Sequence, residues 1–224
     1  MIAFMPDTSS TTYARVGAVL HGIGMISEER MRGVLEEAAP YAHEELDHYE
    51  AACALEEFGV AVSVHADDID SVHHDYASLL DDALRVAGNK VAVTDVRLVE
   101  GEGPLESGRF DTLEFRRNGR LVSVPAEHFA DDYYDQGAAC DAIAETAADD
   151  DPRAWHWVEF EHRPHAGYDS IMVLATQEQL KALHEHLGFT FPDSDGWQAP
   201  ADPPAVRRAW GDVQRNAPGA PGPR

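Results

Sequence analysis

The chain has 224 residues, of which 44% are hydrophobic, a composition that suits a packed domain and excludes wholesale disorder. Aspartate and glutamate number 41 against 17 lysines and arginines, which gives a formal net charge of -24. Because a chain this acidic repels phosphate groups, nucleic acid and anionic membranes are excluded as direct ligands, and a basic protein is the favoured partner.

Cysteine use and the N-terminal residues indicate the cellular context. Cys53 and Cys140 are far apart in sequence, which indicates neither a zinc site nor a disulfide framework and favours a reducing cytoplasm. The N-terminal residues lack a basic segment followed by a long apolar run, so we expect no signal peptide and no membrane anchor. Only Lys90 and Lys181 are lysines, a bias toward arginine that suggests a GC-rich bacterial genome.

The N-terminal third is predicted to be rich in helices. The expected elements are a loose leader (1–12), a strand (13–20), a helix capped by Ser27, a second helix (41–58), a short strand (60–64) and a third helix (71–87). Leu46, Tyr49 and Cys53 contribute to an apolar stripe at helical spacing in the second helix. Residues 27–88 are therefore a candidate helical subdomain.

A β-hairpin is predicted in the middle of the chain, after a strand over 90–99. Asn118-Gly119 lies between two alternating runs, the signature of a two-residue type I′ turn, because both central residues must adopt positive φ. One face of the hairpin is then apolar and the other mainly polar, as in an antiparallel pair with one buried side. The expected cross-strand pairs are Phe115–Val122 and Leu113–Val124.

The C-terminal half combines short strands with helices. The expected elements are a helix (132–148), two strands (155–160 and 171–175), a helix with a capping box at Thr176 that ends at Gly188, and a Pro-rich flexible tail (198–224). Interleaved helices and strands with an antiparallel hairpin predict an α+β fold. We expect one mixed, largely antiparallel sheet flanked by helices, within a single acidic domain over residues 13–197.

The candidate partner-binding segment follows the hairpin. Asp131, Asp132, Tyr133, Tyr134 and Asp135 combine tyrosine, which offers rigid contact area, with carboxylates that complement arginine and lysine. The competing interpretation is that Tyr134 packs inward and the aspartates cap the helix that follows. A second candidate acidic patch lies on the solvent faces of the second predicted helix and consists of Glu44, Glu45 and Asp47.

A metal site is the alternative to a partner-binding surface. His162, His165 and Asp169 surround a Pro/Gly turn, and Glu159 is the nearest further ligand for a zinc-type ion. Glu159 and His162 lie in or beside a predicted strand, where a spacing of three directs side chains to opposite faces. A polar surface turn with no metal is the simpler interpretation of this segment.

The sequence contains no motif that assigns a reaction. It has no G-x-S-x-G elbow, no P-loop and no H-E-x-x-H pair, and we expect no cofactor. The leading hypothesis is a non-enzymatic acidic protein that neutralises a basic partner, most specifically an immunity or antitoxin protein against a nuclease-like toxin. A metal-dependent hydrolase using residues 159–169 is the alternative, and an acidity adapted to high salt is a third explanation.

Overall fold

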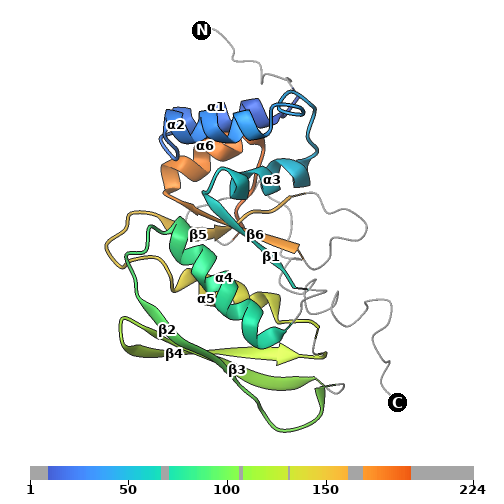
Figure 1. Cartoon of the computed structure of the whole chain (residues 1–224), viewed down its shortest axis with the longest axis vertical. Coiled ribbons are helices and arrows are strands. Elements are labelled where there is room, and N and C mark those ends of the chain that lie inside the picture. Colours follow the sequence, from blue (N-terminus) through green and yellow to red (C-terminus); the bar gives the residue numbers. More distant parts are fainter. Residues whose placement is uncertain (1–9, 67–70, 106–107, 131, 161–168, 193–224) are drawn as a thin grey trace.

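The structure is a computed structural model that describes residues 10–66, 71–105, 108–130, 132–160 and 169–192. Within these residues the chain is an α+β protein with six α-helices and two three-stranded antiparallel sheets (Figure 1). None of the described helices combines the length and the apolar character that crossing a membrane requires.

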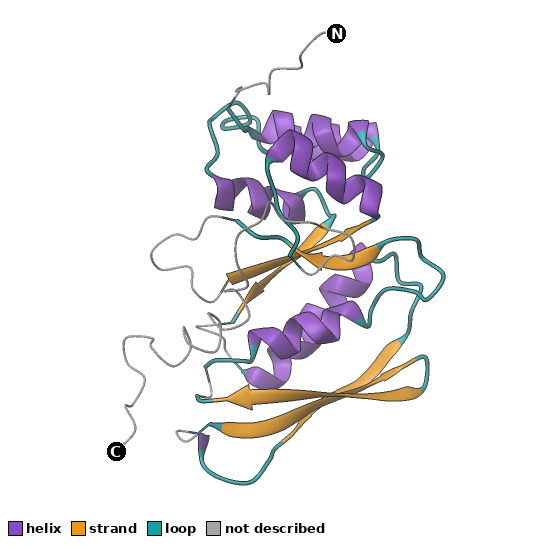
Figure 2. Cartoon of the chain, turned by 180° about the vertical axis from the view of Figure 1, so that it is seen from behind, coloured by secondary structure: helices purple, strands orange, loops and turns teal. Residues whose placement is uncertain are grey.

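Helices and sheets alternate in four layers along the long axis of the molecule (Figures 1 and 2). Four helices cover one face of a sheet that we call the inner sheet, two helices cover its other face, and a second sheet, which we call the outer sheet, lies beyond them. The four helices of the first layer are α1 (Tyr13–Gly22), α2 (Glu28–Glu37), α3 (His48–Glu57) and α6 (Gln177–Leu187), and the inner sheet has the strand order β1 (Ala61–His65), β6 (Asp169–Ala175), β5 (Ala154–Trp157). The two helices of the third layer are α4 (Val72–Val86) and α5 (Gln136–Ala144). The outer sheet has the strand order β2 (Val93–Val99), β3 (Arg109–Arg117), β4 (Arg120–His128).

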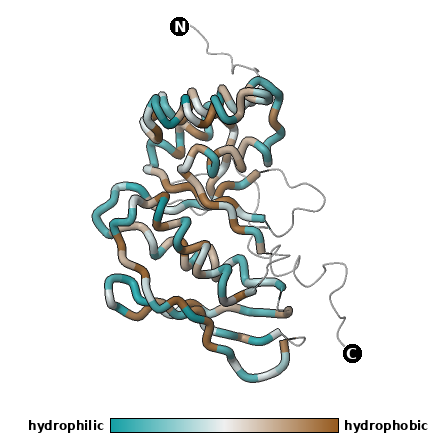
Figure 3. Tube along the Cα trace, viewed as in Figure 1, coloured by the Kyte–Doolittle hydropathy of each residue, from teal (hydrophilic) through white to brown (hydrophobic). Residues whose placement is uncertain are grey.

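The inner sheet is buried on both faces because its strands β1 and β6 each contribute to two cores, while β5 contributes Trp155 to one of them. Val62 and Leu174 point into the core shared with α4, α5 and the outer sheet. Ile171 and Val173 point into the core shared with α1, α2, α3 and α6. An uninterrupted apolar run such as residues 171–175 is expected for a strand that is covered on both sides, and this sheet is accordingly largely hydrophobic in Figure 3.

The outer sheet is buried on one face only. Leu113 and Phe115 of β3 are fully buried against the helical layer, while the residues between and beside them are partly or fully exposed. The turn residues Asn118 and Gly119 have φ angles of 51° and 82°, as a type I′ turn requires. Phe115 pairs with Val122 and Leu113 with Val124, which are the pairs expected from the sequence.

Several helix ends follow the predicted capping residues. Ser27 accepts a hydrogen bond from the backbone N–H of Arg30 at 3.1 Å and precedes α2. Thr176 and Gln179 form the predicted capping box at the start of α6. Gly188 adopts the left-handed conformation at the end of this helix, with a φ of 81°.

The expected strand over 13–20 is instead helix α1. Thr12 caps this helix through its side chain, and Val16 and Leu20, which are four residues apart, are both fully buried. The residue preferences of this segment do not clearly favour a strand or a helix. The helix forms because its buried face, with Val16 and Leu20, packs against α3 and α6.

The expected helix over 41–58 begins only at His48, and the expected single sheet is divided in two. Asp47 forms a capping box with Glu50, so the carboxylates before it lie in a connection and not on a helix. The two sheets share no strand pairing, because α4 and α5 lie between them. The candidate subdomain 27–88 is likewise divided, since α2 and α3 pack in one core and α4 in the other.

Candidate functional site

The segment of aspartates and tyrosines after the hairpin contributes mainly to the fold. The ring of Tyr134 is 3% exposed and lies 5.2 Å, centroid to centroid, from the ring of Tyr76 in the core. Asp135 caps α5 by accepting from Gly137 and Ala138, and its other oxygen accepts from the backbone N–H of Glu127 at 2.8 Å. Burial therefore removes Tyr134 from any partner-binding surface.

The rest of this segment is divided between surface and core. Asp132 is exposed, whereas Tyr133 is half-buried and packs against the core below the inner sheet. Asp131 lies outside the described residues. Within this segment Asp132 is therefore the residue that the structure places in solvent, and the interpretation of Tyr134 and Asp135 as structural residues accounts for their contacts.

A set of exposed carboxylates lies at the helical end of the molecule. We call this set the acidic face, and every member is exposed: Glu28, Glu29, Glu36, Glu37, Glu44, Glu45 and Asp47. It includes the whole of the second predicted patch. The first four belong to α2, and the last three belong to the connection between α2 and α3.

The amphipathic character of α2 presents its carboxylates to solvent. Because successive residues of a helix are about 100° apart, Glu29 and Glu36 lie on the side of α2 opposite the buried residue Val34. Among the six glutamates of the acidic face, the ion pair recorded within the described part of the chain is Glu28–Arg32, at 2.8 Å. The charge of this face is consequently little neutralised by the protein itself.

Charge is distributed unevenly between the two ends of the molecule. Residues 10–58, which contain α1, α2 and α3, carry ten acidic and three basic residues. The three strands of the outer sheet carry four acidic residues and five arginines. A basic protein that approaches this chain is therefore attracted to the helical end and not to the outer sheet.

The residues of the alternative metal site do not form a ligand cluster in the described structure. Glu159 is exposed and accepts a hydrogen bond from the Thr190 hydroxyl at 2.6 Å, whereas Asp169 faces α3. His162 and His165 lie outside the described residues. Among the residues that the structure places, no group of three His, Cys, Asp or Glu side chains is close enough to hold one metal ion.

Asp169 instead connects a histidine to a tyrosine. His65 Nδ1 lies 2.7 Å from one carboxylate oxygen of Asp169, and the Tyr49 hydroxyl donates to the other at 2.8 Å. Burial and this hydrogen bond raise the pKa of Tyr49 above its usual range, so it remains a neutral donor. The side chain of His65 is 58% exposed. Such a carboxylate orients an imidazole, as it does for a general base or a metal ligand.

This arrangement was not predicted from the sequence. His65 and Asp169 are 104 residues apart and become neighbours only because they face each other in the register between β1 and β6. The sequence marked Asp169 through its nearby histidines, but it held no signal for His65 as the partner.

A buried polar network connects the outer sheet to α4. Asp111 accepts hydrogen bonds from Arg109 at 2.6 Å and from the backbone N–H of Gly101 at 2.7 Å. His128 Nδ1 lies 2.9 Å from the other carboxylate oxygen of Asp111, and its Nε2 lies 3.2 Å from the Tyr76 hydroxyl. Gly101 is required at this position, since a Cβ there would lie 1.9 Å from a backbone oxygen of β3.

The charges in this network are set by burial and hydrogen bonding. Burial alone would raise the pKa of Asp111, but hydrogen bonds from Arg109, Gly101 and His128 outweigh it and hold that pKa below its usual value. Burial lowers the pKa of His128, and Asp111 only partly opposes this effect. A neutral ring satisfies both neighbours, because it donates to Asp111 and accepts from Tyr76. Asp111, His128 and Tyr76 are each at most 2% exposed, so the network stabilises the fold and offers no access to a substrate.

A hollow of about 620 Å³ lies where α2, α3, β1 and α4 meet, and the protein itself satisfies its charged groups. Arg30 donates to the backbone oxygens of Glu57 and Phe58 at the end of α3. Arg85 forms an ion pair with Asp82 at 2.7 Å. This hollow therefore offers no unpartnered charge that indicates a ligand.

Comparisons of the chain with protein-family models, with curated proteins and with solved structures find no match.

Proposed function

We propose that this protein is a non-enzymatic acidic binding protein that neutralises a basic protein partner, most specifically as an immunity or antitoxin protein against a nuclease-like toxin. The observation that carries this proposal is the acidic face. Within the described residues, Glu28 is the one of its six glutamates for which an ion pair is recorded. A nuclease surface that binds phosphate is rich in arginine and lysine, and carboxylates complement it in the same way as phosphates do.

The physical advantage of such a surface is rapid association. A protein of net charge -24 generates a negative potential that extends over the surrounding solvent and attracts a basic partner before contact. Electrostatic steering raises association rates to roughly 10⁸–10⁹ M⁻¹s⁻¹ at low salt. A toxin inhibitor requires fast capture, because the target must be bound before it acts.

Local structure supports a preorganised surface. The capping box formed by Asp47 and Glu50 fixes the end of the connection between α2 and α3. Arg30 of α2 donates a hydrogen bond to the backbone oxygen of Glu57 at the end of α3, at 2.6 Å, and so ties together the two helices that flank this connection. A surface whose backbone is already fixed loses less entropy on binding.

Affinity capture from the native lysate tests this proposal, first at low salt and then at roughly 0.5 M salt, where the Debye length is about 4 Å. We expect a stoichiometric basic protein whose binding weakens at high salt. The double variant Glu36→Lys, Glu37→Lys should lose this partner, while its positive charges suit the C-terminal end of α2 and leave the helix intact.

The matched control for capture changes the net charge by the same amount at residues outside the acidic face. Asp81→Lys combined with Asp150→Lys alters the net charge equally, but these exposed residues lie outside the acidic face. Retention of the partner by this control and loss by the α2 variant would assign the interface. Equal loss in both would indicate a non-specific charge effect, and capture of no basic protein would refute the proposal.

A metal-dependent hydrolase is a second candidate, favoured by one specific observation. His65 is held by Asp169 through Nδ1, while its Nε2 has no recorded hydrogen bond within the described residues. Of the ligands suggested by the sequence (Glu159, His162, His165 and Asp169), Asp169 would then act as the group that orients His65. Stoichiometric metal that is lost in His65→Asn and Asp169→Asn would support this function, and unchanged melting of metal-free protein on chelation would contradict it.

A further inference from the structure

The outer sheet exposes large apolar side chains on the face that points away from the helices. None of the described helices or strands covers this face (Figures 1 and 2). The exposed fractions are 68% for Phe110, 51% for Leu121 and 41% for Val99. Several large apolar residues exposed on one sheet indicate a contact surface, because single exposed residues scattered over a protein are the usual pattern.

Both edges of the outer sheet are protected against the addition of another strand. β2 contains an irregularity between Thr94 and Arg97, where Asp95 adopts a φ of 57°. β4 contains Pro125, which has no backbone N–H to donate. Bulges and prolines are the features by which natural sheets prevent edge-to-edge pairing. The face of the sheet, and not its edges, is therefore available for association.

Charges on this face are paired within the sheet. Arg97 contacts Glu114 at 2.6 Å, and Arg116 contacts Asp95 at 3.2 Å. The chain as a whole carries -24, so two copies repel each other over most of their surface. The outer sheet, with five arginines and four carboxylates, is a region where two copies meet without a strong like-charge penalty.

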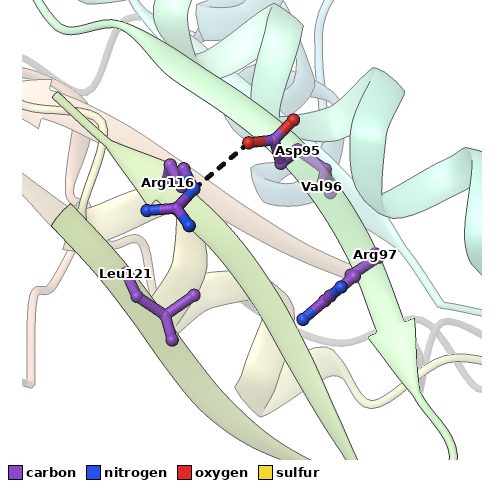
Figure 4. A pocket seen from close by; sticks show the side chains of 5 residues that line it. All are labelled: Asp95, Val96, Arg97, Arg116 and Leu121. Atoms are coloured by element: carbon purple, nitrogen blue, oxygen red, sulfur yellow. Dashed lines mark ion pairs between the residues drawn. The ribbon is translucent and has the colours of Figure 1, made fainter. Parts of the chain in front are cut away.

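The same face contains both a projecting aromatic ring and a hollow. The hollow has a volume of about 350 Å³ and is lined by Asp95, Val96, Arg97, Arg116 and Leu121 (Figure 4). A cavity of about 150 Å³ already accepts a benzene ring, so an aromatic side chain fits. Phe110 lies six residues from Arg116 on β3, which separates the ring from the hollow by about 20 Å along the strand.

We propose that two copies of this chain associate face to face through their outer sheets. A two-fold axis across the strands, near the middle of β3, reverses the strand direction in the second copy. Phe110 of each copy then lies over the hollow of the other, where Leu121 offers an apolar wall and Arg97 and Arg116 offer guanidinium groups for cation–π contact.

This arrangement is independent of the proposed function. The outer sheet and the α1–α2 layer lie at opposite ends of the molecule (Figure 1), so the dimer leaves both acidic faces free. Loss of the dimer therefore leaves partner capture possible, and failure of partner capture leaves the dimer intact. The two experiments have separate readouts.

Sedimentation of the full chain over a range of concentrations tests the dimer. We expect a species of twice 24.6 kDa that dissociates on dilution. Because salt screens the repulsion between two strongly acidic copies, the dimer should become tighter as salt is added. Binding of a basic partner to the acidic face responds to salt in the opposite direction. A mass of 24.6 kDa at every concentration and salt would overturn the proposal.

Two substitutions and a control locate the contact. Phe110→Ser and Leu121→Asp, which change exposed residues, should each raise the dissociation constant of the dimer at least about tenfold, with an unchanged circular dichroism spectrum. Tyr41→Ser changes an apolar residue of 40% exposure in the helical layer and should leave the dimer unchanged. A dimer that persists in both face variants, or that is lost equally in the control, would also overturn the proposal.

Discussion

The two sheets have the same number of strands and the same antiparallel pairing, but they differ in their contact with solvent. Every residue of β6 from Ser170 to Ala175 is buried, because helices cover both faces of the inner sheet. In β3, buried residues alternate with exposed or half-exposed ones, because helices cover one face of the outer sheet. The inner sheet therefore joins two cores, whereas the outer sheet contributes to one core and presents its other face to the surroundings.

This difference separates the tasks of the two ends of the molecule. Residues of the inner sheet are constrained by packing on both sides, so little of that sheet is free to evolve a binding surface. No described helix packs against the outer face of the outer sheet, and its exposed Phe110 and Leu121 belong to neither core. Stability measurements at matched positions test this division.

The largest expected difference lies within β3. Phe115 is fully buried and Phe110 is 68% exposed, although both belong to the same strand. Phe115→Ala should lower the free energy of unfolding by about 3–5 kcal/mol, because it leaves a cavity in the core. Phe110→Ala should change it by less than about 0.5 kcal/mol in dilute, monomeric protein. Urea unfolding measures both, and similar losses would contradict the assignment of the two faces.

A matched pair of leucines compares the two sheets directly. Leu174 of β6 is 1% exposed, and Leu121 of β4 is 51% exposed. Leu174→Ala should destabilise the protein by about 2–5 kcal/mol, whereas Leu121→Ala should remain within about 0.5 kcal/mol at the same low protein concentration. If the leucine of the outer sheet proved equally important for folding, the exposed face would have to be covered in solution.

The buried network predicts a dependence of stability on pH. His128 has a lowered pKa in the folded protein, so the unfolded chain binds a proton first as the pH falls below the usual value of 6.5. Stability is therefore fully present above pH 6.5 and declines below it. Asp111, whose folded pKa is also lowered, adds a further loss as the pH falls below 3.8.

Substitution separates His128 from the other groups that titrate in this range. Chemical unfolding measured between about pH 7 and pH 5 should show a shallower pH dependence in His128→Gln than in the unaltered protein. His156 in the inner sheet also has a pKa lowered by burial, so His156→Gln is the control that retains the network. An unchanged slope in His128→Gln would show that this histidine is not the titrating group.

The smallest expected effect compares two aspartates after the hairpin. Asp135→Ala removes the cap of α5 and should cost about 1 kcal/mol, whereas Asp132→Ala alters an exposed residue and should cost less than about 0.5 kcal/mol. Thermal unfolding of the two variants measures this difference. An equal loss would indicate that the cap contributes nothing beyond the general effect of charge.

Local signals in the sequence were sufficient for several elements. The Asn118-Gly119 turn and the capping box at Thr176 depend on residues close together in the chain, so their geometry could be predicted without any tertiary contact. The same is true of the exposed carboxylates of α2, since an acidic helix face normally points to solvent. Composition likewise identified the acidity on which the proposed function depends.

Contacts between distant residues could not be predicted in this way. Packing against other helices decided whether residues 13–20 form a strand or a helix. Tyr134 is buried because its ring packs against that of Tyr76, which lies 58 positions earlier in the sequence. His65 and Asp169 met through strand register, and Asp111 and His128 met through the pairing of β3 with β4. The sequence by itself determined the class of fold, the hairpin and the acidity, because these depend on local pattern and composition. Only the tertiary structure decided how many sheets form, which polar side chains meet and which face stays open, because each depends on segments that the chain brings together only when it packs.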